Sequence, residues 1–181
     1  MAEVSGPGWC ARFATSTSLD DLLPDFGDRV RAFLTQLRRA GANVQVNATW
    51  RPPQRAYLMH WCCMVGDSGQ DAAAVPALPG VDIDWTHGGD MASARAAARQ
   101  MMVRYRIRFP AALVSRHTQR RAIDMTIAWK GALRVTDFNG QTHVIDAPPR
   151  TGTNPALIGV GASFGVIKLV KDPPHWSDDG H

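Results

Sequence analysis

Two histidines and two aspartates in the C-terminal part of the chain have the types and spacing expected of a metal site with an adjacent base. His117 and Asp124 lie seven residues apart, and Asp172 and His175 lie three apart with two prolines between them. Two histidines and one carboxylate would leave the fourth position of a tetrahedral zinc ion for water, as catalytic zinc sites do. A further carboxylate near that water could act as a general base. The pattern points to a hydrolase.

The spacing between His117 and Asp124 requires the chain to turn between them. Seven extended residues span about 23 Å, whereas each zinc ligand lies about 2 Å from the ion. Residues 118–121 are polar, so we predict a loop there that leads into an apolar strand over residues 122–129. Asp124 would be a carboxylate within that strand, where a metal ion would compensate for its loss of solvent.

Pro173 and Pro174 predict an extended, polyproline-like backbone, which has three residues per turn. Asp172 and His175 would then face the same side, about 9 Å apart along the axis. We expect His175 to bind the metal and Asp172 to reach the attacking water. A surface turn is the other interpretation of this tetrapeptide.

The spacing of apolar residues predicts the elements that must position these side chains. Helices are expected over residues 25–39, 53–65, 90–104 and 155–164. Strands are expected over residues 43–50, 112–115, 122–129, 132–138, 141–145 and 166–170. Asn139-Gly140 predicts a type I′ hairpin turn. Helices first and antiparallel strands later are typical of an α+β fold, and we predict a single domain over residues 1–181 with a loosely ordered segment over residues 1–24.

The charge balance narrows the choice of chemistry and of partners. The formal net charge is +4, and Glu3 is the one glutamate among sixteen acidic residues, so a catalytic carboxylate should be an aspartate. A mildly basic surface suits an anionic bacterial wall, and charge alone would suit nucleic acid equally. Arg104, Arg106 and Arg108 alternate as on a strand edge with few interleaved aromatic residues, so we do not expect nucleic-acid binding.

The N-terminal sequence lacks the basic and apolar segments of a signal peptide, and no apolar run approaches the roughly 20 residues of a membrane span. We therefore expect synthesis in the cytoplasm, no membrane insertion, and delivery to an external substrate by another machine or by lysis. Cys10, Cys62 and Cys63 match no disulfide or zinc-binding pattern and are expected to be buried free thiols.

The order of the candidate residues resembles a known family, the zinc D-Ala-D-Ala carboxypeptidase and L-Ala-D-Glu endopeptidase superfamily, which shares its fold with the hedgehog signalling domain. The motif stands here as Ser115-x-His117-x-x-x-x-Ala122-x-Asp124, followed by a carboxylate three residues before His175-Trp176. The resemblance covers roughly residues 27–177. It implies a small antiparallel sheet flanked by helices, and an enzyme that cleaves the stem peptides of bacterial peptidoglycan.

The resemblance also implies a role for each candidate residue. Zinc would be bound by His117, Asp124 and His175. Asp172 would be the general base that later protonates the leaving amine. Substrate would be contacted by Arg51, Gln54 and Ser115. The guanidinium of Arg51 would suit a stem-peptide carboxylate or the oxyanion.

Two positions depart from the family pattern. Arg120 stands where the family usually has glycine, and Asp172 stands where the carboxypeptidases carry glutamate. Aspartate at the second position is also accepted in phage-type endopeptidases of the family. The resemblance therefore favours an endopeptidase of the L-Ala-D-Glu type over a D-Ala-D-Ala carboxypeptidase.

We expect a zinc-dependent peptidoglycan endopeptidase that serves as a phage-type lysin or a secreted antibacterial effector. Its substrate would be peptidoglycan stem peptides, and an immunity or delivery protein would be a further partner. Two alternatives from other classes stay open. One is a non-catalytic zinc domain of the same fold that binds wall or a protein, and the other is a basic zinc nuclease.

Overall fold

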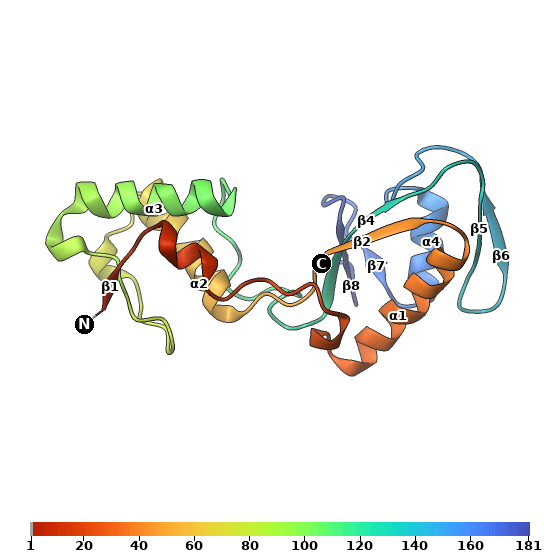
Figure 1. The fold of residues 1–181 in the computed structure, drawn as a ribbon, viewed down its shortest axis with the longest axis horizontal. Coiled ribbons are helices and arrows are strands. Elements are labelled where there is room, and N and C mark those ends of the chain that lie inside the picture. The colour runs from red at the N-terminus through yellow and green to blue at the C-terminus, as the bar shows by residue number, and fades with distance from the viewer. Residues whose placement is uncertain (1) are drawn as a thin grey trace. The chain divides into compact units, whose positions relative to one another are not determined.

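The computed structural model describes residues 2–181 as two compact units, each formed by two stretches of the chain (Figure 1). The first comprises Met1–Thr15 and Arg51–Thr118, and the second comprises Ser16–Trp50 and Gln119–His181. The described residues form four α-helices and, in the second unit, a small antiparallel sheet, which confirms the predicted α+β class. None of the helices described in either unit has both the length and the apolar character needed to cross a membrane. The single domain over residues 1–181 stays a prediction.

The sheet of the second unit has the strand order β2-β4-β8-β7, and each neighbouring pair is antiparallel. Its strands are β2 (Asn43–Ala48), β4 (Ala122–Ala128), β8 (His175–Ser177) and β7 (Ile167–Lys168). Figure 1 shows β2 and β4 running side by side as the long strands of the sheet. Strand β7 is shorter than the predicted 166–170 because the chain turns away from the sheet after Lys168.

Helices α1 (Pro24–Arg39) and α4 (Pro155–Ser163) of this unit form where apolar spacing predicts them. A short 3₁₀ helix, η2 (Leu19–Asp21), precedes α1. The Asn154 side chain accepts hydrogen bonds from two backbone N–H groups of the first turn of α4, which a helix start otherwise leaves without partners. Both helices supply buried core residues, including Phe26, Phe33, Leu34, Leu37, Leu157 and Val160.

Strand β4 separates the core from the opposite face of the sheet. Successive side chains of a strand point to opposite faces. Ile123, Met125 and Ile127 are buried in the core with α1 and α4. Asp124 and Thr126 therefore lie on the other face, where the strand is partly or fully exposed.

The predicted hairpin is present, but its turn differs from the prediction. The strands are β5 (Leu133–Thr136) and β6 (Thr142–Ile145). A type I′ turn needs positive φ at both central residues, whereas Gly140 has a φ of 84° and Asn139 is not in that region. The Asp137 carboxylate accepts hydrogen bonds from two backbone N–H groups of the loop. These hydrogen bonds stabilise a loop that is longer than the two-residue turn predicted from Asn139-Gly140.

In the first unit, α2 (Pro53–Gly66) packs against α3 (Met91–Tyr105), and both form as predicted (Figure 1). Strand β1 (Glu3–Val4) pairs in parallel with β3 (Ile83–Asp84). The 3₁₀ helices of this unit are η1 (Pro7–Ala11), η3 (Ala72–Ala74) and η4 (His87–Gly89). Within the stretch expected to be loosely ordered, Trp9 is buried in the core of this unit.

Residues 112–115 do not form the predicted strand. Leu113 and Val114 are 43% and 72% exposed. An apolar run favours a strand because a pleated surface can pack it against neighbours, and here the side chains face solvent instead.

The three cysteines are buried free thiols, as predicted. Burial raises the pKa of Cys10, Cys62 and Cys63 above the usual value for a thiol. Because the thiolate is the nucleophile, a raised pKa lowers the fraction of each group in the reactive form at neutral pH.

Candidate metal centre

Pairing of β4 with β8 brings Asp124 and His175 together. The two are direct partners in the antiparallel ladder. Their neighbours Ile123 and Trp176 are buried in the core, so Asp124 and His175 share the opposite face. His175 Nδ1 lies 3.1 Å from Asp124 Oδ1, and the two side chains are only 9% and 20% exposed. The register of two strands thus creates half of the predicted site.

His117 completes the group. Potential ligand atoms of His117, Asp124 and His175 all lie within 4.8 Å of one another. His117 is 4% exposed. This buried group could hold a metal ion, and two nitrogen donors with one carboxylate suit zinc as well as other divalent ions.

A turn over residues 116–120 provides the bend predicted between His117 and Asp124. Ser115 and Thr118 close its first part by reciprocal hydrogen bonds. The Ser115 N–H donates to Thr118 Oγ1 at 2.8 Å, and the Thr118 N–H donates to Ser115 Oγ at 3.3 Å. The observed role of the motif serine is therefore to shape the backbone that carries His117.

The other residues predicted to contact substrate lie at the start of α2. The Arg51 N–H donates to the His117 carbonyl at 3.2 Å, so the backbone of Arg51 lies beside that of His117. Gln54 is half-buried in the first turn of α2. Substrate contact by Arg51, Gln54 and Ser115 stays a prediction.

Arg120 stands where the resemblance noted above would place a glycine. Its φ is 64°, in the left-handed region that glycine adopts most easily. The Arg120 Nε–H donates to the Asp21 carbonyl at 2.5 Å, and the Arg120 carbonyl accepts from the Leu23 N–H at 3.0 Å. The arginine therefore keeps the glycine-like conformation because bonds to the segment before α1 hold it there.

Hydrogen bonds fix both ring nitrogens of His175. Nδ1 lies toward Asp124, and the Nε2–H donates to the His181 carbonyl at 3.1 Å. Burial by itself would lower the pKa of His175. The hydrogen bond and charge of Asp124, with smaller contributions from the His181 carbonyl and the charge of Asp172, outweigh burial, so the net effect is a raised pKa. Because Nε2 has a main-chain partner, Nδ1 is the nitrogen that His175 would offer to a metal, and such a hydrogen bond on the other nitrogen is common in metal-binding histidines.

The Asp172–His175 segment is a turn rather than the predicted polyproline segment. The His175 N–H donates to the Asp172 carbonyl at 3.0 Å. This i to i+3 bond brings the two Cα atoms to within about 7 Å, closer than the 9 Å of an extended segment. Asp172 is exposed and His175 is buried. The turn keeps the predicted carboxylate close in sequence and space to the candidate ligand, although the predicted backbone was wrong.

Lys168 is a participant that sequence reasoning missed. It lies on β7, and it is only 5% exposed. Its ammonium donates hydrogen bonds to the carbonyls of Leu169, Asp172 and His175 at 2.6, 2.5 and 3.0 Å. The available signal was a single lysine inside the apolar run 166–170, which is unusual because lysine is rarely buried without partners.

A groove of about 480 Å³ lies beside the turn, within the second unit. Its lining residues carry no charged side chains and include hydroxyl, amide and apolar groups. Thr126 lies on the same face of β4 as Asp124, and its Oγ1 accepts a hydrogen bond from the Asn47 side-chain amide at 2.8 Å. The lining residues are Asn47, Met125, Thr126, Ile127, Thr151, Gly152, Thr153, Pro173 and Pro174.

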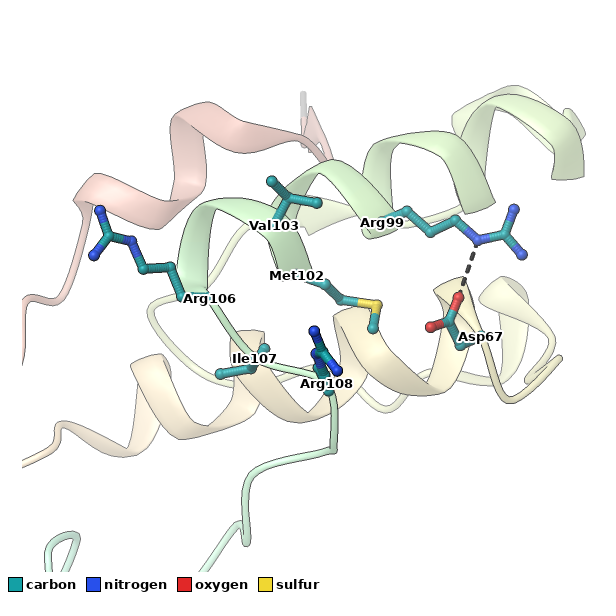
Figure 2. Close-up of a pocket in the computed structure, with 7 residues that line it drawn as sticks. All are labelled: Asp67, Arg99, Met102, Val103, Arg106, Ile107 and Arg108. Carbon is teal, nitrogen blue, oxygen red and sulfur yellow. Dashed lines mark hydrogen bonds and ion pairs between the residues drawn. The ribbon is translucent and has the colours of Figure 1, made fainter.

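A second pocket, of about 690 Å³, lies in the first unit and contains part of the arginine run (Figure 2). Arg104 lies in the last turn of α3 and Arg106 is its C-cap residue, so this run is not the strand edge that we predicted. Arg99 is paired with Asp67 at 3.0 Å. Figure 2 shows the guanidinium groups of Arg99 and Arg106 at opposite ends of the pocket, so they do not converge on one anion.

Among the residues that the structure describes, His117, Asp124 and His175 are the one group of three potential metal ligands. Asp84, at the end of β3, accepts hydrogen bonds from the N–H and the hydroxyl of Thr86. These hydrogen bonds lower the pKa of Asp84. No protein-family model matches the chain, and no curated protein matches it.

Proposed function

We propose that the protein is a zinc-dependent hydrolase that cleaves a peptide bond in the stem peptides of bacterial peptidoglycan. The observation that carries this proposal is the buried group of His117, Asp124 and His175, whose potential ligand atoms lie within 4.8 Å of one another. Two histidines and one carboxylate are the donor set of catalytic zinc sites. The resemblance to the zinc carboxypeptidase and endopeptidase superfamily supports the choice of substrate. It also supports the fold that this superfamily shares with the hedgehog signalling domain.

His117, Asp124 and His175 would hold the ion, and bound zinc would supply Lewis acidity toward the scissile carbonyl and the attacking water. Asp172 would accept a proton from that water while the water oxygen bonds to the carbonyl carbon. Asp172 would then return the proton to the amide nitrogen as the C–N bond breaks. The products are a carboxylate and a free amine, and the exposed position of Asp172 lets both proton transfers occur at a solvent-facing carboxylate.

Arg51 would bind a carboxylate of the stem peptide, because a guanidinium matches a carboxylate with two parallel hydrogen bonds. Gln54 and Ser115 would add polar contacts. The neutral groove beside Pro173 and Pro174 would accept an uncharged part of the peptide, since its lining offers hydroxyl and amide groups but no charge.

We place the activity at the bacterial wall, after the protein has been delivered there by an export machine or by lysis. An endopeptidase of the L-Ala-D-Glu type is favoured over a D-Ala-D-Ala carboxypeptidase by the aspartate at position 172. A delivery or immunity protein would be a partner in the effector role.

Mass spectrometry of purified peptidoglycan fragments, incubated with the zinc-loaded protein, tests the proposal. Asp172→Asn removes the base, and Asp146→Asn changes an exposed aspartate in the loop after β6 as a matched control. New stem-peptide termini from the unmodified protein and Asp146→Asn, but not from Asp172→Asn, are the expected result, and they identify the bond. Stoichiometric zinc without cleavage would favour the non-catalytic binding domain, and cleavage of DNA in the same preparation would favour the nuclease.

A further inference from the structure

Lys168 is a buried cation at the base of the segment that carries His175. The ammonium has three N–H groups. Each has a backbone carbonyl as partner, at Leu169, Asp172 and His175. The Lys168 Nζ also lies 5.6 Å from the ring centroid of Trp176, which is fully buried. The side chain is therefore held on all sides by the segment that follows it.

The same three carbonyls also accept the backbone hydrogen bonds that fold the segment. Leu169 accepts from the Asp172 N–H at 3.1 Å, Asp172 accepts from the His175 N–H at 3.0 Å, and His175 accepts from the Leu169 N–H at 3.1 Å. A carbonyl has two lone pairs, so each can receive one backbone donor and the ammonium. Two successive turns are thus closed around one cation.

Each of the three carbonyls keeps a second lone pair after it has accepted its backbone hydrogen bond. Pro173 and Pro174 have no N–H group, so neither of these two residues can supply a further backbone donor. Lysine offers three donors and no acceptor, which suits a group of carbonyls.

We propose that Lys168 is a positioning residue for the metal centre. It holds residues 169–175 in the conformation that sets His175 across from Asp124 and keeps Asp172 next to it, before any metal binds. This inference rests on the proposed metal centre. Lys168 does not touch the reacting atoms in this scheme, because its hydrogen bonds all go to backbone carbonyls. Because the segment is already ordered, metal binding does not have to supply the free energy of ordering it.

The full-length protein with Lys168→Met, Lys168→Gln and Lys171→Met tests the proposal. Lys171 lies in the same segment and is exposed, so it is the matched control. Zinc affinity is measured by competition with a chromophoric chelator, and urea unfolding of the metal-free proteins is measured in parallel. Loss of an outer-shell partner typically weakens metal affinity by about 10- to 100-fold, and we expect this for Lys168→Met with no change for Lys171→Met. Lys168→Gln, which keeps two donors, should be intermediate and serves if the methionine variant does not fold.

Lower unfolding stability with unchanged zinc affinity of the folded protein would overturn the proposal, because it would make Lys168 structural only. Hydrogen exchange of the Asp172 and His175 amides gives a readout that needs no metal. Exchange at least about tenfold faster in the Lys168 variants is expected, since local opening sets amide protection, and unchanged exchange would also overturn it. Absence of zinc binding by the unmodified protein would instead reject the metal centre, and the exchange result would still decide whether Lys168 orders the segment.

Discussion

Asp124 and His175 are direct partners across the β4–β8 ladder, with Asp124 Oδ1 3.1 Å from His175 Nδ1. Their meeting depends on register, because a one-residue slip would turn one of the two side chains into the core. Ile123 and Trp176 oppose such a slip, since both are fully buried on the other face. The core packing of the second unit and the placement of Asp124 beside His175 are therefore set by the same pairing.

Asp124→Asn should abolish tight zinc binding. The amide is a weaker ligand than the carboxylate, and it removes the negative charge that would compensate a dication. We expect a loss of affinity greater than the about 100-fold typical of outer-shell changes, measured by chelator competition. Asp146→Asn is the control with the same chemical change at an exposed position, and equal affinities of the two variants would contradict the assignment of Asp124.

The stability of the metal-free protein should fall as pH rises through neutrality. Burial opposes protonation of His175, but its partners, Asp124 first, raise its pKa overall. A raised folded-state pKa stabilises the fold fully below the unfolded value of about 6.5, and this contribution is lost as pH rises through the folded-state pKa. Urea unfolding of the unmodified protein and Asp124→Asn from pH 5.5 to 8.5 measures it. The stability difference between them should be larger at the acidic end, and a larger difference at the basic end would contradict the sign.

A candidate ligand could be recognised from the sequence where a polar residue interrupts an apolar pattern. Asp124 is such a residue on β4, and the structure places it with His117 and His175. Backbone detail was not predictable in the same way. Pro173 and Pro174 allow both an extended segment and a turn, and the choice is made by the ammonium of Lys168. That interaction goes to backbone carbonyls, so a lysine within an apolar run marks the donor in the sequence but not its acceptors.

The helices were predictable because their signals are local, whereas two strand features were not. Apolar spacing defined α1, and an asparagine followed by a proline marked the start of α4. Residues 112–115 have the composition of a strand. Whether such a segment forms a strand depends on another strand that pairs with it, which the local sequence does not reveal. The hairpin turn likewise depends on a side chain. The Asp137 carboxylate accepts hydrogen bonds from the Asn139 and Gln141 N–H groups, and these bonds accompany a loop other than a type I′ turn.

Replacement of Arg120 should distinguish the side chain from the backbone conformation at this turn. Arg120→Ala and Arg120→Gly both remove the hydrogen bond to the Asp21 carbonyl. Alanine must still adopt a φ of 64°, at a cost of roughly 1–2 kcal/mol that glycine avoids. Because glycine also loses more backbone entropy on folding, we expect the glycine variant to be more stable by about 1 kcal/mol in urea unfolding. An alanine variant as stable as the glycine variant would contradict the left-handed conformation.

Two glycines of α4 provide a test of the packing behind the candidate centre. A Cβ atom at Gly161 would lie 2.6 Å from the Trp176 ring and 3.0 Å from the Val166 carbonyl, whereas a Cβ at Gly159 meets nothing within 4 Å. Gly161→Ala should therefore destabilise the protein by about 1–3 kcal/mol through overpacking. Gly159→Ala should stabilise it by up to about 1 kcal/mol, since alanine is the better helix former. Because Trp176 adjoins His175 on β8, Gly161→Ala should also weaken zinc binding while Gly159→Ala leaves it unchanged. Urea unfolding and chelator competition measure the two effects, and equal stabilities of the two variants would contradict the close contact between α4 and β8.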